Sequence, residues 1–139
     1  MGSGIVSSKP GKQRKAHFQA PKHLVHRQFT VPVSGSQTQY PNIYRAPVRE
    51  GDRVEIERGQ GTKPGYSDKD HKVKGAQGKV LRVDYKRHLV FVEDLKQRKR
   101  GNKVADRAVD PRNITILAFN TEDKRRKAKL EAINARGSK

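Results

Sequence analysis

The chain has 139 residues, with 32 Lys and Arg against 14 Asp and Glu, so its formal net charge is +18. A surplus of this size calls for a dense anionic partner, and nucleic acid is the densest common one. No apolar run is long enough to cross a membrane or to act as a signal peptide, and the first residues do not fit the myristoylation pattern, so no membrane anchor is expected.

Basic and apolar residues are distributed unevenly along the chain. Residues 1–46 carry seven basic residues and no acidic one, residues 47–95 carry eleven and nine, and residues 96–139 carry fourteen and five. Leu, Ile, Val and Phe together number 29, and 17 of them lie within residues 53–119. One small core with poorly cored basic arms is therefore expected. The predicted parts are a basic extended N-terminal arm over 1–46, a barrel over 47–119 and a basic C-terminal helix or tail over 120–139.

Aromatic and His rings alternate with cations in the N-terminal arm. The rings are His17, Phe18, His23, His26 and Phe29. This mixture is typical of segments that stack on unpaired bases while holding phosphates. Some of the rings could pack on the barrel instead. The later stretch 32–41, rich in Ser, Thr, Gly and Pro, is expected to be irregular.

Alternating or apolar runs in the middle of the chain predict short strands. They cover 53–57, 79–84, 88–93 and 113–117, with a further brief strand near 103–104. The run 88–93 is the most apolar and is expected at the centre of the sheet. Several short strands with Gly-bearing turns and no intervening helix predict a mainly β fold, a small antiparallel barrel or sandwich.

A helix is predicted after Phe119. Asn120 or Thr121 can cap it, and helix-forming residues continue to Ala135. Its apolar positions are too few for a firm core face, and the cations at 124–127 lie in its first turns, where the helix dipole disfavours them. We therefore expect this helix to lie on RNA.

Two segments carry a family resemblance. Residues 47–59, resumed at 74–83, look like a KOW motif, and residues 12–23 resemble the basic extension of one ribosomal protein family in archaea and eukaryotes. The turn and strand at 109–114 are similar to that family's closing strand. The chain thus resembles the universal large-subunit ribosomal protein family numbered twenty-four in bacteria and archaea and twenty-six in eukaryotes.

The resemblance implies an SH3-like barrel (KOW) docked on large-subunit rRNA in cytoplasmic ribosomes. It also implies early entry into the assembling subunit, a place near the exit of the peptide tunnel, and neighbouring large-subunit proteins and tunnel-exit factors as partners. The sequence departs from the family at residues 60–73, where the family has a short connection. This lengthened loop could meet RNA or solvent. The extension favours an archaeal or eukaryotic ribosome over a bacterial one.

The candidate RNA-binding residues are the cations and rings of the arm, the KOW glycines with their neighbouring cations, and three later basic clusters. They are Lys12, Arg14, Lys15, His17, Phe18, Lys22, His23, His26, Arg27, Arg45, Arg49, Lys74, Gly75, Gly78, Lys79, Arg82, Lys86, Arg87, Lys96, Arg98, Lys99, Arg100, Arg112, Lys124, Arg125, Arg126 and Lys127. The glycines could alternatively serve only to shape barrel turns.

Catalytic and metal-binding interpretations find little support. The run 75–80 has two residues between its glycines where a phosphate loop has four. With no Cys and no acidic residue before Glu50, a metal site at His17, His23 and His26 is not expected. We expect that the protein is not an enzyme and that it binds no cofactor. Two other binding functions stay open, namely a KOW-type transcription elongation factor and a non-specific nucleic-acid chaperone.

Overall fold

The computed structural model describes residues 7–35, 38–58, 74–98 and 103–137. The lengthened loop at 60–73 and the candidate cations Lys99 and Arg100 lie outside the described residues. In chain order the elements are α1 (Pro10–Phe18), α2 (Lys22–Gln28), β1 (Thr30–Pro32), β2 (Arg45–Pro47), β3 (Arg53–Ile56), β4 (Gln77–Asp84), β5 (Leu89–Arg98), β6 (Val104–Val109), the 3-10 turn η1 (Pro111–Asn113), β7 (Ile114–Ala118) and α3 (Lys124–Arg136).

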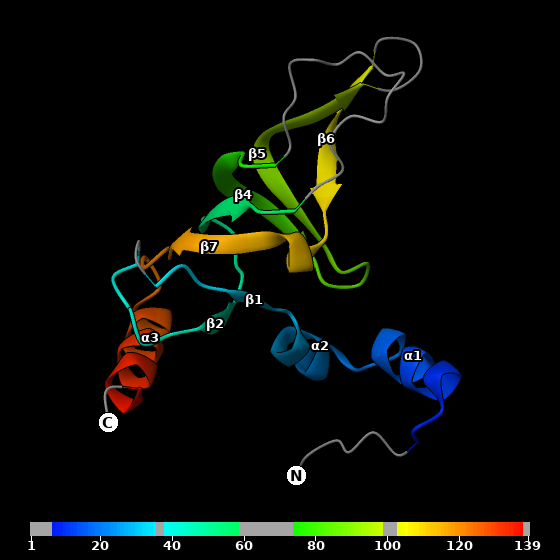
Figure 1. Ribbon diagram of the computed structural model, residues 1–139, viewed down its shortest axis with the longest axis horizontal. Helices are drawn as coiled ribbons and strands as arrows, with labels where there is room; N and C mark the ends of the chain where they lie inside the picture. The colour runs from blue at the N-terminus through cyan, green and yellow to red at the C-terminus, as the bar shows by residue number, and fades with distance from the viewer. Residues whose placement is uncertain (1–6, 36–37, 59–73, 99–102, 138–139) are drawn as a thin grey trace.

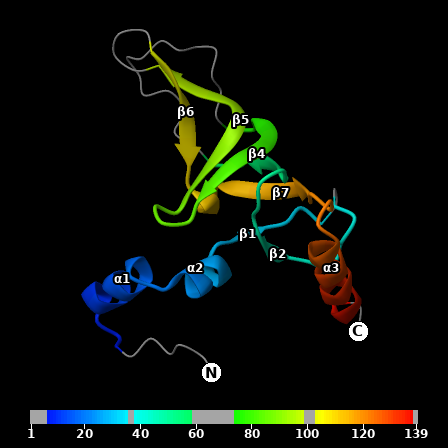
Figure 2. The ribbon, with the colours of Figure 1, turned by 180° about the vertical axis from the view of Figure 1, so that it is seen from behind.

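The strands form two antiparallel sheets, so the expected mainly β class is confirmed. Five strands lie in the order β6-β5-β4-β3-β7, and β1 pairs with β2 separately. A single bridge between Val33 and Ile116 joins the small sheet to the edge strand β7. Figures 1 and 2 show β4 and β5 as long, curved strands of the barrel. Helix α3 lies on one side, and the N-terminal helices lie below the β4–β5 hairpin.

One apolar core is shared by both sheets. Val54, Val90 and Ile116 are fully buried in it, and Phe29 and Ile43 are almost as fully buried. The expectation of a poorly cored N-terminal arm is therefore wrong for the second half of that arm. The apolar residues there are scattered among polar ones, and only the pairing of β1 with β2 brings them together over β7.

The strands bend where their pairing register shifts. The register shifts between Val80 and Arg82 in β4, and again on β5 between Phe91 and Lys96, where Asp94 has a φ of 63°. Such bulges increase twist and let a short sheet curl on itself. The bulge also lets β5 continue to Arg98, beyond the predicted end at 93. β5 is internal, but the middle strand is β4, so the prediction that 88–93 is central is wrong by one position.

Helix α3 is part of the core. Asp123, and neither Asn120 nor Thr121, caps it, because its carboxylate accepts from the backbone N–H of Arg125 at 2.9 Å. Leu130 is 5% exposed and belongs to the core cluster. The helix was expected to have too few apolar positions for a firm core face, and its one buried apolar side chain, Leu130, lies on the helix with buried Arg126.

Candidate nucleic-acid interface

The two N-terminal helices present cations without acidic partners. Neither helix contains an acidic residue, and α1 has no buried residue. Within the part of the chain that the structure describes, no ion pair includes a cation of α1 or α2. The predicted residues Lys12, Arg14, Lys15, Lys22, His23, His26 and Arg27 are all exposed. Charges placed in this way are free to bind an external polyanion.

Rings from the N-terminal helices pack against rings of the β4–β5 hairpin. The ring of His17 stacks on that of His88 with centroids 4.5 Å apart, and the ring of His26 lies 4.0 Å from that of Tyr85. Phe29 contacts both hairpin rings, at 5.2 Å from Tyr85 and 6.0 Å from His88. We call His17, Phe18, His26, Phe29, Tyr85 and His88 the hairpin ring cluster.

The ring cluster answers a question that the sequence left open. Most arm rings do pack on the barrel, but Phe18 keeps 64% of its surface exposed. A cavity of about 440 Å³ lies beside the cluster. Its lining residues are Phe18, Ala20, Lys22, Val25, His26, Tyr85, Lys86 and His88. Rings beside two lysines form a surface on which a base and its phosphate could both be held.

Burial changes the titration of two members of this cluster. It raises the pKa of Tyr85 above its ordinary value, and Arg49 partly opposes the change. Burial also lowers the pKa of His88, and the neighbouring His17 lowers it further. Asp110 and Asp84 act in the opposite direction. The lowered pKa therefore favours the uncharged form of His88.

Three glycines of the KOW-like segments, Gly51, Gly75 and Gly78, are explained by the backbone conformation or by close packing. Gly51 and Gly75 have φ values of 87° and 81°, which other residues rarely adopt. At Gly78 a Cβ would lie 2.7 Å from Val92 Cγ1 and 2.9 Å from the carbonyl oxygen of Glu93, so the close approach of β4 to β5 requires glycine. The cations beside these turns, Lys74 and Lys79, are exposed. The close packing of β4 on β5 is enough to explain the glycine at position 78, without any contact to RNA.

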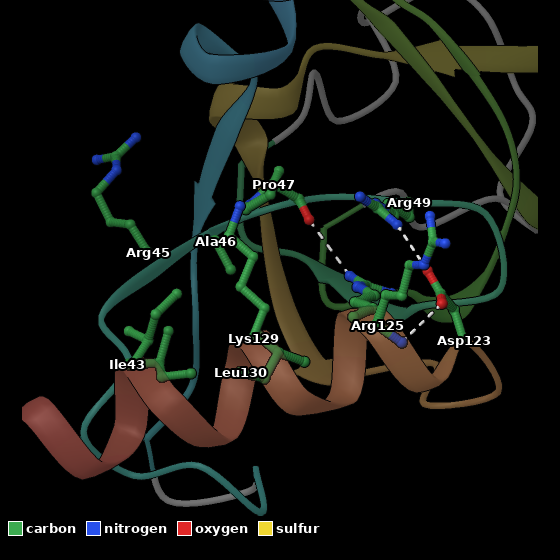
Figure 3. Close-up of a pocket in the computed structure, with 11 residues that line it drawn as sticks. Ile43, Arg45, Ala46, Pro47, Arg49, Asp123, Arg125, Lys129 and Leu130 are labelled. Atoms are coloured by element: carbon green, nitrogen blue, oxygen red, sulfur yellow. Dashed lines mark hydrogen bonds and ion pairs between the residues drawn. The ribbon is translucent and has the colours of Figure 1, made fainter.

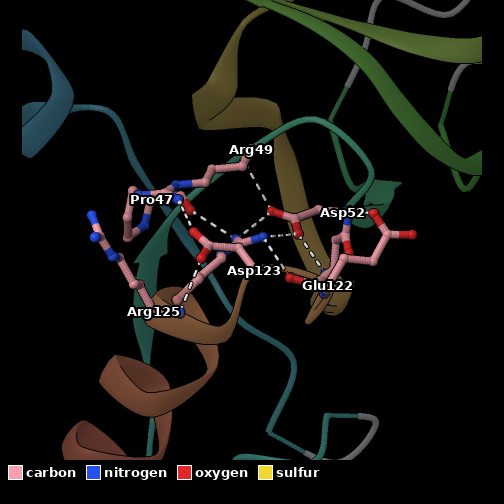
Figure 4. A network of polar contacts seen from close by, with 8 residues as sticks. Pro47, Arg49, Asp52, Glu122, Asp123 and Arg125 are labelled. Carbon is pink, nitrogen blue, oxygen red and sulfur yellow. Dashed lines mark hydrogen bonds and ion pairs between the residues drawn. The ribbon is translucent and has the colours of Figure 1, made fainter.

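One predicted RNA-binding residue, Arg126, is buried in a polar network. Asp52 is fully buried, and Arg126 is 7% exposed. Two guanidinium nitrogens of Arg126 donate to the two oxygens of Asp52 at 2.5 and 2.7 Å (Figure 4). The same group also donates to the carbonyls of Asn120 and Pro47 at 3.1 and 3.3 Å. Arg126 therefore ties α3 to the barrel, and its placement does not fit the predicted contact with RNA.

The neighbours of Arg126 on α3 face outward. Lys124, Arg125, Lys127 and Lys129 are exposed. A groove of about 360 Å³ runs between β2 and α3, as Figure 3 shows. It is lined by Ile43, Arg45, Ala46, Pro47, Arg49, Asp123, Arg125, Arg126, Lys129, Leu130 and Ile133. The sequence placed Arg45, Arg49 and Arg125 in separate segments, and the fold brings them to this groove.

The other predicted cations are distributed over the barrel. Arg82 lies over the ring of Phe91, with its Cζ 4.2 Å from the centroid. Arg112 pairs with Asp110 at 3.4 Å, and both groups are solvent-accessible, so the pair contributes little stability. Arg87 and Lys96 are exposed. For Arg98 the structure describes the backbone in β5 alone.

Several residues at these surfaces were missed by sequence reasoning. Tyr85 and His88 are absent from the predicted set, although two rings on either side of a Lys-Arg pair could have suggested a surface for stacking. Tyr44 is 81% exposed, and Lys129 lines the groove. Nothing local in the sequence distinguishes buried Asp52 from the other acidic residues.

Among the described residues there is no group of three or more His, Cys, Asp or Glu side chains placed to hold a metal ion. Over the same part of the chain, no helix is both long enough and apolar enough to cross a membrane.

Comparison with known proteins places most of the chain in one group. The family model described as ribosomal proteins L26 of eukaryotes and L24P of archaea matches residues 7–132. Large ribosomal subunit protein uL24 of Methanosphaera stadtmanae is 32% identical over 125 residues, 90% of this chain and 97% of that protein. The uL24 proteins of Haloarcula marismortui and Korarchaeum cryptofilum are 29% and 30% identical over 127 residues each, 91% of this chain and 96% and 88% of those proteins.

Proposed function

Because the chain belongs to the ribosomal protein family called L26 in eukaryotes and L24P in archaea, we propose that it is a structural constituent of the large ribosomal subunit that binds rRNA. Its place is then the ribosome in the cytoplasm, with rRNA and neighbouring ribosomal proteins as partners. The family is one of ribosomal structural proteins, not of enzymes. Early assembly, a position near the tunnel exit and contacts with tunnel-exit factors belong to this proposal.

The observation that carries rRNA binding is the set of unpaired cations on α1 and α2. Seven basic residues in the first 46 face no acidic residue of their own segment. In the described structure, none of those on α1 or α2 takes part in an ion pair. Cations of this kind gain most by releasing counterions from a phosphate backbone.

Each of the three predicted parts of the chain would contribute contacts to RNA. Residues 1–46 supply the N-terminal helices and their cations, and residues 47–119 supply the barrel with its hairpin ring cluster. Residues 120–139 supply the outward cations of α3. The RNA contacts would come from the exposed members of the predicted set, without Arg126 and with Gly78 in a packing role.

Binding of the full-length protein to protein-free large-subunit rRNA of an archaeal relative tests this proposal. The triple variant Lys12→Gln, Arg14→Gln, Lys15→Gln removes three cations of α1. The matched control Arg58→Gln, Lys103→Gln, Arg136→Gln removes three exposed cations that lie outside the predicted set. Each lost phosphate contact should reduce the slope of log affinity against log salt by about 0.7–0.9.

We expect the α1 variant to lower the slope by about two units and the control to lower it by less than one. The wild-type protein should co-sediment with the large subunit in sucrose gradients at rising salt. Equal affinity for unrelated structured RNA would favour the nucleic-acid chaperone. Release at low salt, or co-purification with RNA polymerase, would contradict the ribosomal assignment.

A further inference from the structure

We propose that the groove between β2 and α3 binds a single unpaired nucleotide of RNA, with its base on the apolar floor and its phosphate on the basic rim. The proposal rests on the proposed function, because it assumes that RNA is the partner. It assigns a ligand class to a site distinct from the hairpin ring cluster.

The walls of the groove are held in fixed positions. Arg126 fastens the first turn of α3 to Asp52 and to the Pro47 carbonyl. At the other end of the helix, Asn42 donates two hydrogen bonds to Asn134, from its backbone N–H to the side-chain Oδ1 at 3.0 Å and from its side-chain amide to the backbone carbonyl at 3.1 Å. A rigid groove loses little conformational entropy when it binds a ligand.

The floor of the groove is aliphatic. Ile43, Ala46 and Leu130 are buried at its base, and Ile133 is 40% exposed at its side. Figure 3 shows Ile43 next to α3, the helix that carries Leu130. Groups of this kind accept a flat apolar surface such as the face of a base, and they give a bare phosphate nothing to bind.

The rim carries positive charge that the protein does not neutralise. Of the lining residues, only Asp123 is acidic, and its two oxygens are occupied by Arg49 at 3.4 Å and by the backbone N–H of Arg125 at 2.9 Å. The side chains of Arg45, Arg125 and Lys129 take part in no ion pair in the described portion of the chain. Arginines beside an aliphatic floor can stack on a base and also bind a phosphate.

The size and edges of the groove favour one nucleotide over a peptide. Its volume of about 360 Å³ is near the lower end of the range for small-molecule sites, about 300–1,000 Å³. An extended peptide would have to add to the edge of β2, where Pro47 has no N–H to offer. The groove has no aromatic ring among its lining residues, so it suits one extruded base better than a stacked run.

The first experiment follows the methyl groups of Ile43, Leu130 and Ile133 by NMR in the full-length protein. The probes are the four ribonucleoside 5′-monophosphates, with ribose 5-phosphate and inorganic phosphate as anions that lack a base. We expect the methyl signals to respond to at least one nucleotide at about tenfold lower concentration than to ribose 5-phosphate, because base contacts add to the phosphate contact. No response to any nucleotide, or an equal response to ribose 5-phosphate, overturns the proposal.

The second experiment uses matched variants on α3. Lys129→Ala removes a rim cation, and Arg136→Ala removes an exposed cation of the same helix that neither lines the groove nor belongs to the predicted RNA-binding set. Ile133→Ser changes the floor, and Ala132→Ser is its control. Lys129→Ala and Ile133→Ser should each weaken binding to large-subunit rRNA about tenfold, with each control changing it by less than threefold.

The outcomes separate this inference from the proposed function. If wild-type protein binds the rRNA and each groove variant matches its control, the groove inference fails while the proposed function stands. If wild-type protein does not bind the rRNA, the proposed function fails, and the inference that rests on it fails with it. If a Leu- and Glu-containing peptide shifts the methyl signals at lower concentration than any nucleotide, the groove is a protein-docking site and the inference is wrong.

Discussion

Replacing Arg126 with Met should lower the free energy of unfolding by about 3 kcal/mol, at the lower end of the usual range for breaking a buried ion pair. The guanidinium makes four hydrogen bonds, two to Asp52 and two to main-chain carbonyls. The cost stays at the lower end because Asp52 keeps two other donors. The backbone N–H groups of Arg49 and Asn120 each donate to its carboxylate at 2.8 Å.

Replacing the partner of Arg126, Asp52, should lower the free energy of unfolding further. Asp52→Ala leaves a buried guanidinium with carbonyl partners alone and deprives the N–H groups of Arg49 and Asn120 of their acceptor. We expect a loss of about 5 kcal/mol. Because both single changes break the same pair, the double variant should lose less than the sum of the two.

Urea denaturation followed by circular dichroism measures these differences. Arg125→Met is the matched control, since Arg125 is the exposed neighbour on the same helical turn. It should change the free energy of unfolding by less than about 0.5 kcal/mol. If Arg126→Met costs no more than Arg125→Met, or if the losses at Asp52 and Arg126 simply add, the network does not hold α3 as described.

Three further predictions follow from other parts of the structure. Gly78→Ala should destabilise the protein by about 1–3 kcal/mol in thermal denaturation, because its Cβ would meet Val92 and Glu93. Gly11→Ala, which meets nothing within 4 Å in α1, should be neutral or slightly stabilising. The lowered pKa of His88 means that its contribution to stability is complete above the ordinary value of 6.5 and is lost as pH falls through the lowered pKa. His88→Asn, which tolerates the φ of 55°, should remove this pH dependence of the midpoint temperature, and an unchanged dependence would exclude His88 as its source. Amide exchange of the free protein should show protection at the N–H groups of Phe29 and Val33, which bond to Val25 and Tyr44, and rapid exchange there would contradict the shared core.

The strands of the barrel were predictable because their signals are local. Arg53–Ile56 alternates polar and apolar residues, whereas β5 begins with the continuous apolar run Leu89–Val92, and the pairing register shifts at bulges near Leu81 and Asp94. A bulge leaves little trace in a single sequence, because its cause is the curvature of the whole sheet. The position of β5 was misjudged for a related reason. Its apolar run reflects packing against several elements and does not mark the middle of the sheet.

The arm and α3 were harder to interpret because their core contacts are distant in sequence. Phe29, Val31 and Ile43 are isolated apolar residues in a basic segment, and only the pairing of two three-residue strands shows that they share a core. Arg126 belongs to a run of four cations, and nothing in that run shows that one of them meets Asp52, 74 residues earlier. The exposed cations could be predicted from composition, and the groove they form with β2 required the fold.

Helix α1 has nine residues and no buried side chain, and it reaches the barrel through the rings of His17 and Phe18. Isolated helices of this length are marginal in water, so its helicity depends on this contact or on an external partner. Phe29 and Val31, which follow the two N-terminal helices, are buried in the core. Under the proposed function, the first contact with RNA should therefore form at α1. This helix could separate from the β4–β5 hairpin and reach RNA at a greater distance from the barrel, and the barrel should contact the RNA afterwards. The association rate would then depend on α1, and the dissociation rate on the barrel and α3.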